Sequence, residues 1–385
     1  MKLVKIVACA ALLMPSLSSA AVGFTPEPIG KVETLPARYP SHWLLVHDFS
    51  FFHMSEGEIL VVDPLAENLG DQYKGMMPAS FIAAYQYGAK RNEHYVVESF
   101  FARGGRGGDR TDVVTVWDPA TLKVTGEVTI PAKRVTGMPK MLMSGLMGGE
   151  KFLGVYNFTP AQSVSIVNLE DRTFVAEIPT PGCGFLLPHG ERSFSSLCAN
   201  GSLHTSHLNE DGTLAGTSKT GVVFDPEKDP IFENPGVSNG VAFFPTFQGR
   251  ILPIDLADKI PAVRPAWWLT DADERDWRPG GLNPITVDSE GLGYLLMHAE
   301  GGEGTHKDGG AEVWVFDLAQ GQQLGRIALN NWGISIGATG VGNDRLLVVT
   351  NAELALDVYR MPSGEFVQTL NTGAQTPFMV YGSAR

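Results

Sequence analysis

The chain has 385 residues with 44 glycines and 25 prolines, and its formal net charge is −13. So many turn-forming residues are typical of a protein built from many short β-strands. The acidic balance, together with the lack of a basic stripe, disfavours nucleic-acid binding.

Residues 1–20 have the pattern of a secretory signal peptide. Two lysines precede an apolar run that ends at Met14, and small residues follow up to Ala20. We predict cleavage after Ala20 and export of the remainder. The apolar run is too short to span a bilayer, and no later stretch approaches about 18 apolar residues. We therefore expect no membrane span.

Residues 21–385 are predicted to form a single domain with an extended, proline-rich N-terminal arm. The first strands are expected over residues 43–46 and 58–62, with HDFSFFHMSEG between them. That loop carries Phe49, Phe51 and Phe52. Such an aromatic loop either plugs a core or lines an apolar pocket, and the sequence leaves both interpretations open.

A glycine- and arginine-rich loop, FFARGGRGGDRTD, begins at Phe100. It lacks the Gly-Lys-Ser/Thr ending of a phosphate-binding loop, and no helical pattern follows it. We expect a flexible loop that meets a partner or the rim of a sheet. Further along, TDADERDW over residues 270–277 is predicted as a short helix, with Thr270 or Asp271 as its N-cap.

Two cysteines remain once the signal peptide is removed, Cys183 and Cys198. An exported protein favours a disulfide between its only two thiols, and two strands joined by HGER would bring them together. Closing a loop of about 15 residues would stabilise the fold by roughly 3 kcal/mol.

The clearest β-hairpin is AEVWVFDLAQGQQLGRIAL, residues 311–329. The alternation of period two ends at Asp317, and Gly321 can adopt the positive φ that the turn needs. The return strand is expected over residues 324–329. One hairpin cannot bury its apolar face alone, so the sequence needs further copies.

Copies of this strand–turn–strand unit begin near residues 57, 112, 163, 202, 249 and 354. In each, the first strand ends at an anchor residue, and an Asp or Asn there can bond the backbone two residues on. The anchors are Asp63, Asp118, Asn168, His207, Asp255, Asp317 and Arg360. Their spacing of roughly 40 to 60 residues is that of propeller blades. We predict an all-β fold, a seven-bladed β-propeller.

Motifs for chemistry are missing from the sequence. There is no Cys-x-x-Cys-His, no His-Glu-x-x-His, no EF-hand loop and no Gly-x-Ser-x-Gly elbow. His306, between glycine clusters in GGEGTHKDGG, is a candidate catalytic group, but a structural role fits a lone loop histidine better. The chain is therefore interpreted as a scaffold with no catalytic residue, metal or cofactor of its own.

Several segments in this order resemble a known family. They are FFHMSEGEILVVD, DRTDVVTVWDPATL, IPAKRVTGM, the hairpin from Cys183 to Cys198, KDPIF at 228–232, WRPGG at 277–281 and EGTHKDGGAEVWVFD at 303–317. From about Trp43 to the last repeat, the chain resembles the heavy subunit of bacterial quinoprotein amine dehydrogenases. It is more similar to the aromatic amine dehydrogenase type than to the methylamine type.

The resemblance implies a seven-bladed propeller that pairs with a small, disulfide-rich light chain in an α2β2 heterotetramer. The light chain would hold the cofactor, tryptophan tryptophylquinone, and the catalytic base. The complex would oxidise a primary amine, aromatic or aralkyl, to an aldehyde and ammonia in the periplasm. Its electrons would pass to a cupredoxin of the azurin or amicyanin type.

The resemblance also implies that a phenylalanine of the first-blade loop lines the substrate channel, with Phe51 and Phe52 as the candidates. The alternative function is a periplasmic propeller of the same ancestry without a quinone light chain. It would act as a binding module or as a lactonase-like hydrolase. A lactonase would need convergent carboxylates at a central metal, and the sequence offers no such constellation.

Overall fold

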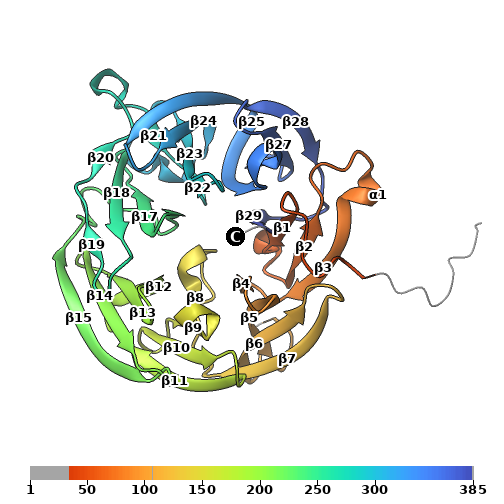
Figure 1. Cartoon of the computed structure of the whole chain (residues 1–385), viewed down its shortest axis with the longest axis vertical. Helices are drawn as coiled ribbons and strands as arrows, with labels where there is room; N and C mark the ends of the chain where they lie inside the picture. The colour runs from red at the N-terminus through yellow and green to blue at the C-terminus, as the bar shows by residue number, and fades with distance from the viewer. Residues whose placement is uncertain (1–33, 106, 384–385) are drawn as a thin grey trace, which may run out of the picture. The chain divides into compact units, whose positions relative to one another are not determined.

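The computed structural model describes residues 34–105 and 107–383. The predicted signal peptide, its cleavage site at Ala20 and most of the predicted arm lie outside the described residues. From Leu35 on, the chain packs as one unit whose sheets stand in a ring around a common centre (Figure 1). The predicted all-β propeller is thereby confirmed.

Four antiparallel sheets have four strands in order from the inside of the ring to the outside. The first is β29 (Pro377–Gly382), β1 (Leu44–Asp48), β2 (Gly57–Val62) and β3 (Tyr73–Ala79). The second is β4 (Ala84–Gly88), β5 (Glu93–Phe101), β6 (Arg110–Asp118) and β7 (Lys123–Ile130). The third is β8 (Ser144–Met147), β9 (Phe152–Asn157), β10 (Ser163–Asn168) and β11 (Thr173–Pro179). The fourth is β12 (Cys183–His189), β13 (Ser193–Cys198), β14 (Ser202–Leu208) and β15 (Leu214–Val222).

The two remaining sheets are larger. One comprises β16 (Gly236–Ser238), β17 (Val241–Pro245), β18 (Arg250–Asp255), β19 (Ala262–Val263) and β20 (Trp267–Trp268). The other comprises β21 (Arg278–Pro279), β22 (Ile285–Val287), β23 (Leu292–His298), β24 (Gly310–Asp317), β25 (Gln322–Thr339), β26 (Leu346–Asn351), β27 (Leu356–Arg360) and β28 (Glu365–Leu370). The described strands thus form six hydrogen-bonded sheets, whereas the sequence predicted seven blades.

The count differs because of β25, which is 18 residues long. The predicted hairpin is present: Asp317 pairs with Gln322, and Gly321 has a φ of 65°. The return strand was expected to end at residue 329. Instead β25 continues, and its last residues pair with β26, Thr339 lying opposite Leu346. One strand therefore joins eight strands into a single sheet.

Helical structure is confined to single turns in the described part of the chain. They are α1 (Leu69–Gln72) and the 3-10 turns η1 (Phe51–His53), η2 (Met141–Met143), η3 (Gly148–Glu150), η4 (Ala272–Glu274), η5 (Thr305–Lys307) and η6 (Gly342–Asp344). The helix predicted over residues 270–277 was wrong in extent. Only η4 forms there, after Asp271, whose side chain makes no capping hydrogen bond.

The predicted anchors lie at, or one residue from, the ends of β2, β6, β10, β14, β18, β24 and β27. Asp63, Asp118, Asn168, Asp255 and Asp317 each accept a hydrogen bond from a backbone N–H two or three residues on, as predicted. His207 does not start a turn, because its ring bonds the Ser193 and Ser218 hydroxyls on neighbouring strands.

The core lies between adjacent sheets, so both faces of most strands are buried. On β24, Trp314 and Phe316 belong to one apolar cluster and Val313 belongs to another. Neither face of such a strand is exposed to water along its whole length. Hydrophobic and polar residues therefore do not alternate strictly along it. The ring closes where the C-terminal strand β29 pairs with β1, Val380 lying opposite Val46.

Candidate functional site

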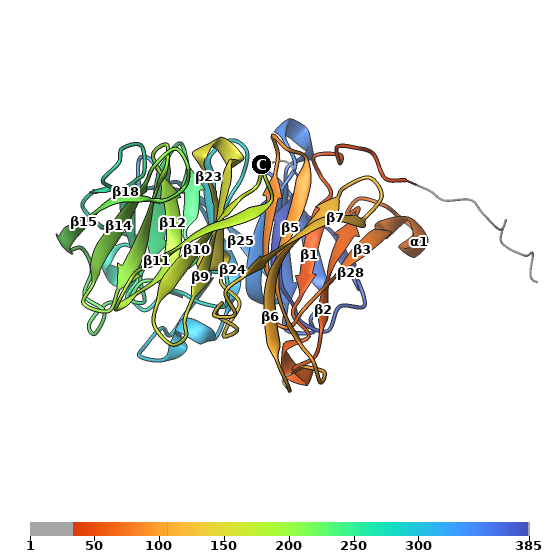
Figure 2. The ribbon, with the colours of Figure 1, turned by 90° about the horizontal axis from the view of Figure 1, so that it is seen from below.

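One end of the propeller carries the loops of interest, and we call it the η1 end. Antiparallel strands alternate in direction, so the loop between the second and third strands of each sheet lies at the same end as the connection to the next sheet. The η1 end therefore includes residues 49–56, 80–83, 102–105, 107–109, 131–140, 158–162, 180–182, 199–201, 223–235, 246–249, 299–309, 352–355 and 371–376. Figure 2 shows the η1 turn and the tip of the β5–β6 hairpin projecting from the same edge.

Four of the segments that carry the family resemblance have loops at this end. They are FFHMSEG, IPAKRVTGM, KDPIF and EGTHKDGG, which are far apart in the sequence. Contacts join three of them. The rings of Phe232 in KDPIF and His306 in EGTHKDGG have centroids 6.4 Å apart, and Lys140, two residues after IPAKRVTGM, pairs with Glu233, directly after KDPIF, at 2.7 Å.

A buried carboxylate fixes the aromatic loop. Asp48, at the end of β1, accepts hydrogen bonds from the backbone N–H groups of Ser50 and Thr376 at 2.8 Å and of Gln375 at 2.7 Å. The Phe51 N–H donates to the Thr376 hydroxyl at 2.8 Å. Ser50 adopts a left-handed conformation with a φ of 45°. These bonds hold the η1 turn against the connection between β28 and β29.

The three phenylalanines of this loop have different environments. Phe49 is only 2% exposed and stacks on the ring of His47, with centroids 3.8 Å apart. Phe51 is half-buried and meets Phe81 and Phe378 at centroid distances of 6.4 and 6.0 Å. Phe52 is 68% exposed. The loop therefore plugs the core through Phe49 and projects an aromatic ring through Phe52, while the assignment of Phe51 and Phe52 to a substrate channel stays a prediction.

His47 is held neutral beneath this loop. The ring is fully buried, and neither nitrogen has a hydrogen-bond partner among the described residues. Burial lowers the pKa of His47 to about 3. A neutral, unbonded imidazole acts here as an aromatic packing group and not as an acid or base.

A cavity of about 280 Å³ lies between the η1 loop and the glycine-rich loop after β5. Phe81, Phe100 and Phe101 give it aromatic walls, Ser80 and Ser99 contribute hydroxyls, and Glu56 lies at its border. The two loops approach closely, since a Cβ on Gly105 would lie 3.9 Å from the Met54 carbonyl oxygen.

An ionic network lies behind this cavity. Arg110 binds Asp112 with both ends of its guanidinium, at 2.7 and 2.8 Å, and the Ser99 hydroxyl donates to the same carboxylate. Arg134 is buried and donates to the carbonyls of Ile82, Val135 and Phe81 and to the Ser80 hydroxyl. Burial lowers the pKa of Arg134 to about 10, so the guanidinium remains charged at neutral pH.

The carboxyl of Glu98 completes the network. It accepts from the Ser80 N–H and the Thr115 hydroxyl, and burial raises its pKa above the usual range. Ser80 is thereby held from three sides, by Glu98, by Arg134 and by the Ser99 N–H. The position of the cavity floor is fixed by these bonds.

His306, which the sequence singled out, stacks on Phe247 and is half-buried. Burial lowers the pKa of His306 from its ordinary value. Among residues 34–105 and 107–383, no group of three or more His, Cys, Asp or Glu side chains could hold a metal ion.

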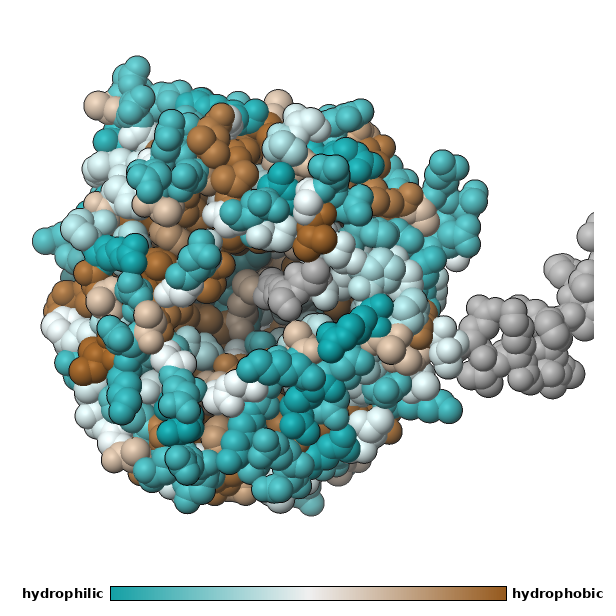
Figure 3. Space-filling view, in the orientation of Figure 1, coloured by the Kyte–Doolittle hydropathy of each residue, from teal (hydrophilic) through white to brown (hydrophobic). Residues whose placement is uncertain are grey.

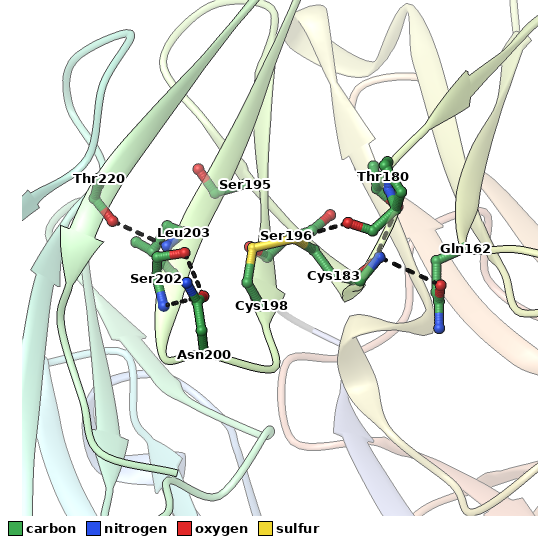
Figure 4. Close-up of a disulfide and its surroundings, with 12 residues drawn as sticks. Gln162, Thr180, Cys183, Ser195, Ser196, Cys198, Asn200, Ser202, Leu203 and Thr220 are labelled. Carbon is green, nitrogen blue, oxygen red and sulfur yellow. Dashed lines mark hydrogen bonds between the residues drawn. A yellow bond between two sulfur atoms is a disulfide. The ribbon is translucent and has the colours of Figure 1, made fainter.

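The predicted disulfide is present. Cys183 and Cys198 lie opposite each other on β12 and β13, and their sulfurs are 2.08 Å apart (Figure 4). The pair is at the η1 end of its sheet, where the Thr180 hydroxyl donates to the Cys183 carbonyl. The disulfide links the start of the inner strand β12 to the end of β13, next to the loop that precedes β14.

The η1 end also exposes the large apolar side chains of Phe52, Met54, Met138 and Phe158. Two more exposed rings border it: Phe100, near the end of β5, and Trp332 of β25, whose indole N–H donates to the Asp308 carbonyl. On the opposite face, hydrophilic side chains alternate with apolar patches (Figure 3). A cavity of about 360 Å³ lies on that side, lined by Asp288, Thr339 and Gly340 among others. No helix in the described part of the chain is long and apolar enough to cross a membrane.

Sequence reasoning missed Asp48, Arg134 and Glu98. Asp48 was visible in HDFSFFHM, but two of the residues that it binds, Gln375 and Thr376, lie more than 320 residues away. A signal was present for Glu98, because a carboxylate amid the apolar residues of a strand is expected to be buried with partners.

Solved structures give the same architecture. The fold is similar to a periplasmic gluconolactonase from Pseudomonas aeruginosa, with a TM-score of 0.55 and 15% identity over 86% of this chain and 95% of that one. It is also similar to a dihydro-heme d1 dehydrogenase, with a TM-score of 0.53 and 14% identity over 94% and 80% of the two chains. At these identities the likeness shows the propeller fold alone.

The sequence comparisons are more specific. The chain is 30% identical over 263 residues to the methylamine dehydrogenase heavy chain of Methylobacillus flagellatus, covering 67% of this chain and just under two-thirds, 65%, of that relative. It is 26% identical over 386 residues to the heavy chain of Methylophilus methylotrophus, covering 96% and 93%. The family model for methylamine dehydrogenase heavy chains matches residues 41–383. The chain therefore belongs to the methylamine dehydrogenase heavy chain family.

Proposed function

We propose that this chain is the heavy subunit of a periplasmic amine dehydrogenase and that its light chain docks on the η1 end. The observation that carries the proposal is that Phe52, Met54, Met138 and Phe158 are exposed on that end, next to an aromatic loop that Asp48 clamps in place. Exposed apolar surface of this kind marks interfaces between proteins. Family membership makes a light chain the expected partner.

In this proposal the light chain holds the tryptophan tryptophylquinone and the catalytic base, and the quinone supplies the oxidation of the amine. This chain positions the light chain and helps to shape the substrate channel. Phe51 and Phe52 line the channel, because the Asp48 clamp presents them at the surface where the partner would sit. An aromatic ring in a channel offers apolar surface and does not transfer protons.

The remaining features of the proposal are taken from the sequence and from its resemblance to quinoprotein amine dehydrogenases. We propose an α2β2 heterotetramer, a signal peptide cleaved after Ala20, and electron transfer to a cupredoxin of the azurin or amicyanin type. Aromatic or aralkyl amines are the proposed substrates, although the relatives named above are methylamine dehydrogenases. The blade count proposed is seven, with the eight-stranded sheet divided within β25, since its two ends pair with β24 and β26 respectively.

The test is co-expression with an amine dehydrogenase light chain, followed by co-purification and amine-dependent dye reduction. The heavy chain alone should show neither quinone absorption nor activity. Phe52→Asp should abolish co-purification, because a charge would be buried in the interface. Leu69→Asp is the matched control, since Leu69 is 70% exposed, close to the 68% of Phe52, but lies between β2 and β3 at the opposite end. Equal binding by both variants would refute docking on the η1 end.

A further inference from the structure

The cavity between the η1 loop and the glycine-rich loop has aromatic walls and a volume suited to a small organic ligand. Four parts of the chain line it: residues 54–56, residues 80–81, residues 99–101 with 104–105, and Thr136. Its walls include Phe81, Phe100 and Phe101, and its volume is about 280 Å³. Pockets that take drug-sized ligands begin at about 300 Å³. Methylammonium, with one carbon and one nitrogen, would leave most of this space unfilled.

The cavity also has a carboxylate that is not paired within the described part of the chain. Glu56 lines the cavity, and among the described residues its side chain has no hydrogen-bond or ion-pair partner. Two nearby cations have partners elsewhere: Arg110 binds Asp112, and Arg134 donates to three carbonyls and a hydroxyl. The Arg103 side chain lies over Gly107, where a Cβ would be 3.7 Å from its Nε.

From this combination we infer that the cavity is a binding site for an aralkylammonium ion, with Glu56 as the partner of the ammonium group and the three phenylalanines around the aryl group. An apolar pocket with one charged group at its border favours a ligand that has both features. Aromatic faces also attract organic cations through the ring quadrupole. The inference rests on the proposed function for its choice of a primary amine, and the site would collect the substrate on this chain beside the channel.

The position of the site is fixed before a ligand arrives. Ser80 and Ser99 are tied to each other and to the Arg110, Asp112 and Arg134 network, so the floor has no freedom to collapse. A preformed pocket avoids the entropic cost of ordering on binding. We therefore expect the isolated heavy chain to bind the ligand without a partner.

The experiment measures binding of three probes to the purified heavy chain by calorimetry or ligand-observed NMR. They are 2-phenylethylammonium, methylammonium and the neutral 2-phenylethanol. The aralkylammonium should bind about fivefold more tightly than the alcohol at low salt, the scale of one exposed charge pair, and this margin should shrink at high salt. Methylammonium should bind more weakly than either aryl probe.

Glu56→Gln should remove the preference for the amine over the alcohol while leaving binding of the alcohol unchanged. Glu67→Gln is the control, because Glu67 is also an exposed glutamate but lies between β2 and β3 at the other end. Phe100→Ala should weaken both aryl probes together. Equal affinity for amine and alcohol in the native chain, or an unchanged preference in Glu56→Gln, would overturn the assignment.

Assembly with the light chain is measured in parallel, so that the two proposals can fail separately. If the complex forms and oxidises amines but the heavy chain binds no aralkylammonium, the site is wrong and the proposed function stands. If the chain binds the probe through Glu56 but never assembles with a light chain, the site stands and the proposed function is wrong.

Discussion

The Asp48 carboxylate accepts hydrogen bonds from both the backbone N–H and the hydroxyl of Thr376, 328 residues further along the chain. The same carboxylate bonds the Ser50 and Gln375 N–H groups. A single buried side chain thus ties the loop after the first strand to the connection before the last one. The surface that we propose for partner binding depends on this clamp.

Replacing Asp48 should therefore loosen the loop and lower stability. Asp48→Ala leaves three backbone N–H groups without acceptors, and we expect a loss of about 2–4 kcal/mol in the free energy of unfolding. Asp48→Asn keeps one carbonyl acceptor and should lose less. Urea unfolding measures both. Asp118→Ala, at an exposed turn at the opposite end, should have a smaller effect; an equal one would argue against a special role for the clamp.

Substitutions of the three phenylalanines of the η1 loop should have different effects: on stability for Phe49, and on substrate preference for Phe51 and Phe52. Phe49→Ala removes a buried ring and should cost about 3–5 kcal/mol of stability. Phe52→Ala changes an exposed side chain and should alter stability by no more than about 0.5 kcal/mol. In the assembled complex, Phe51→Ala or Phe52→Ala should change kcat/KM ratios between short and bulky amines by about 1–3 kcal/mol. Melting curves of the heavy chain and amine profiles of the complex check these expectations. An unaltered profile with a large fall in Tm for Phe52→Ala would remove it from the channel.

The disulfide should contribute measurably to stability. It closes a loop with a sequence separation of 15, for which the chain-entropy model gives roughly 3 kcal/mol. Peptide mapping of the mature protein without reductant should recover Cys183 linked to Cys198. The double change to serine should lower the free energy of unfolding by that amount. Free thiols at both positions in periplasmic material would contradict the assignment.

Acid should destabilise the fold through two buried imidazoles. Burial lowers the pKa of His47 from 6.5 to about 3 and that of His94 from 6.5 to about 4. Below pH 6.5 the unfolded chain binds protons that the folded chain does not, so stability falls as the pH drops from 6.5 towards 4. Each group contributes at most about 1.4 kcal/mol per pH unit.

The variant His47→Phe isolates one of these contributions. A phenyl ring keeps the stacking on Phe49 and cannot bind a proton, so the loss of stability between pH 6.5 and 4 should be shallower than in the native chain. His53→Gln in the exposed η1 turn is the control. Urea unfolding at several pH values provides the measurement, and parallel pH dependences in native and His47→Phe proteins would show that His47 does not contribute.

The sequence predicted those structural features that depend only on residues close together in the chain. Asp317 and Gly321 fix a turn within five residues of each other, so their roles could be inferred from the printed sequence. The same holds for the pairing of the only two cysteines outside the predicted signal peptide. The continuation of β25 past residue 329 was not predictable, because it depends on β26, which pairs with it only after the chain has folded back.

The site was predictable only in outline. The aromatic loop was found because three phenylalanines in four residues are conspicuous, but the sequence could not separate Phe49 from Phe52. Burial of Phe49 is decided by the ring of His47 and by the core behind it. The cavity beside Glu56 arises where four separate segments meet, and no single segment of the sequence contains it.

The pairing of β29 with β1 has a consequence for biosynthesis. Thr376 and the strand that follows it are made more than 320 residues after Asp48, yet Asp48 needs them before the η1 turn can be fixed. During translation, a chain that has not yet reached β29 cannot present its aromatic loop in the docking geometry. The pairing thereby acts as a check on synthesis: only a copy that includes β29 offers a surface that a partner can recognise.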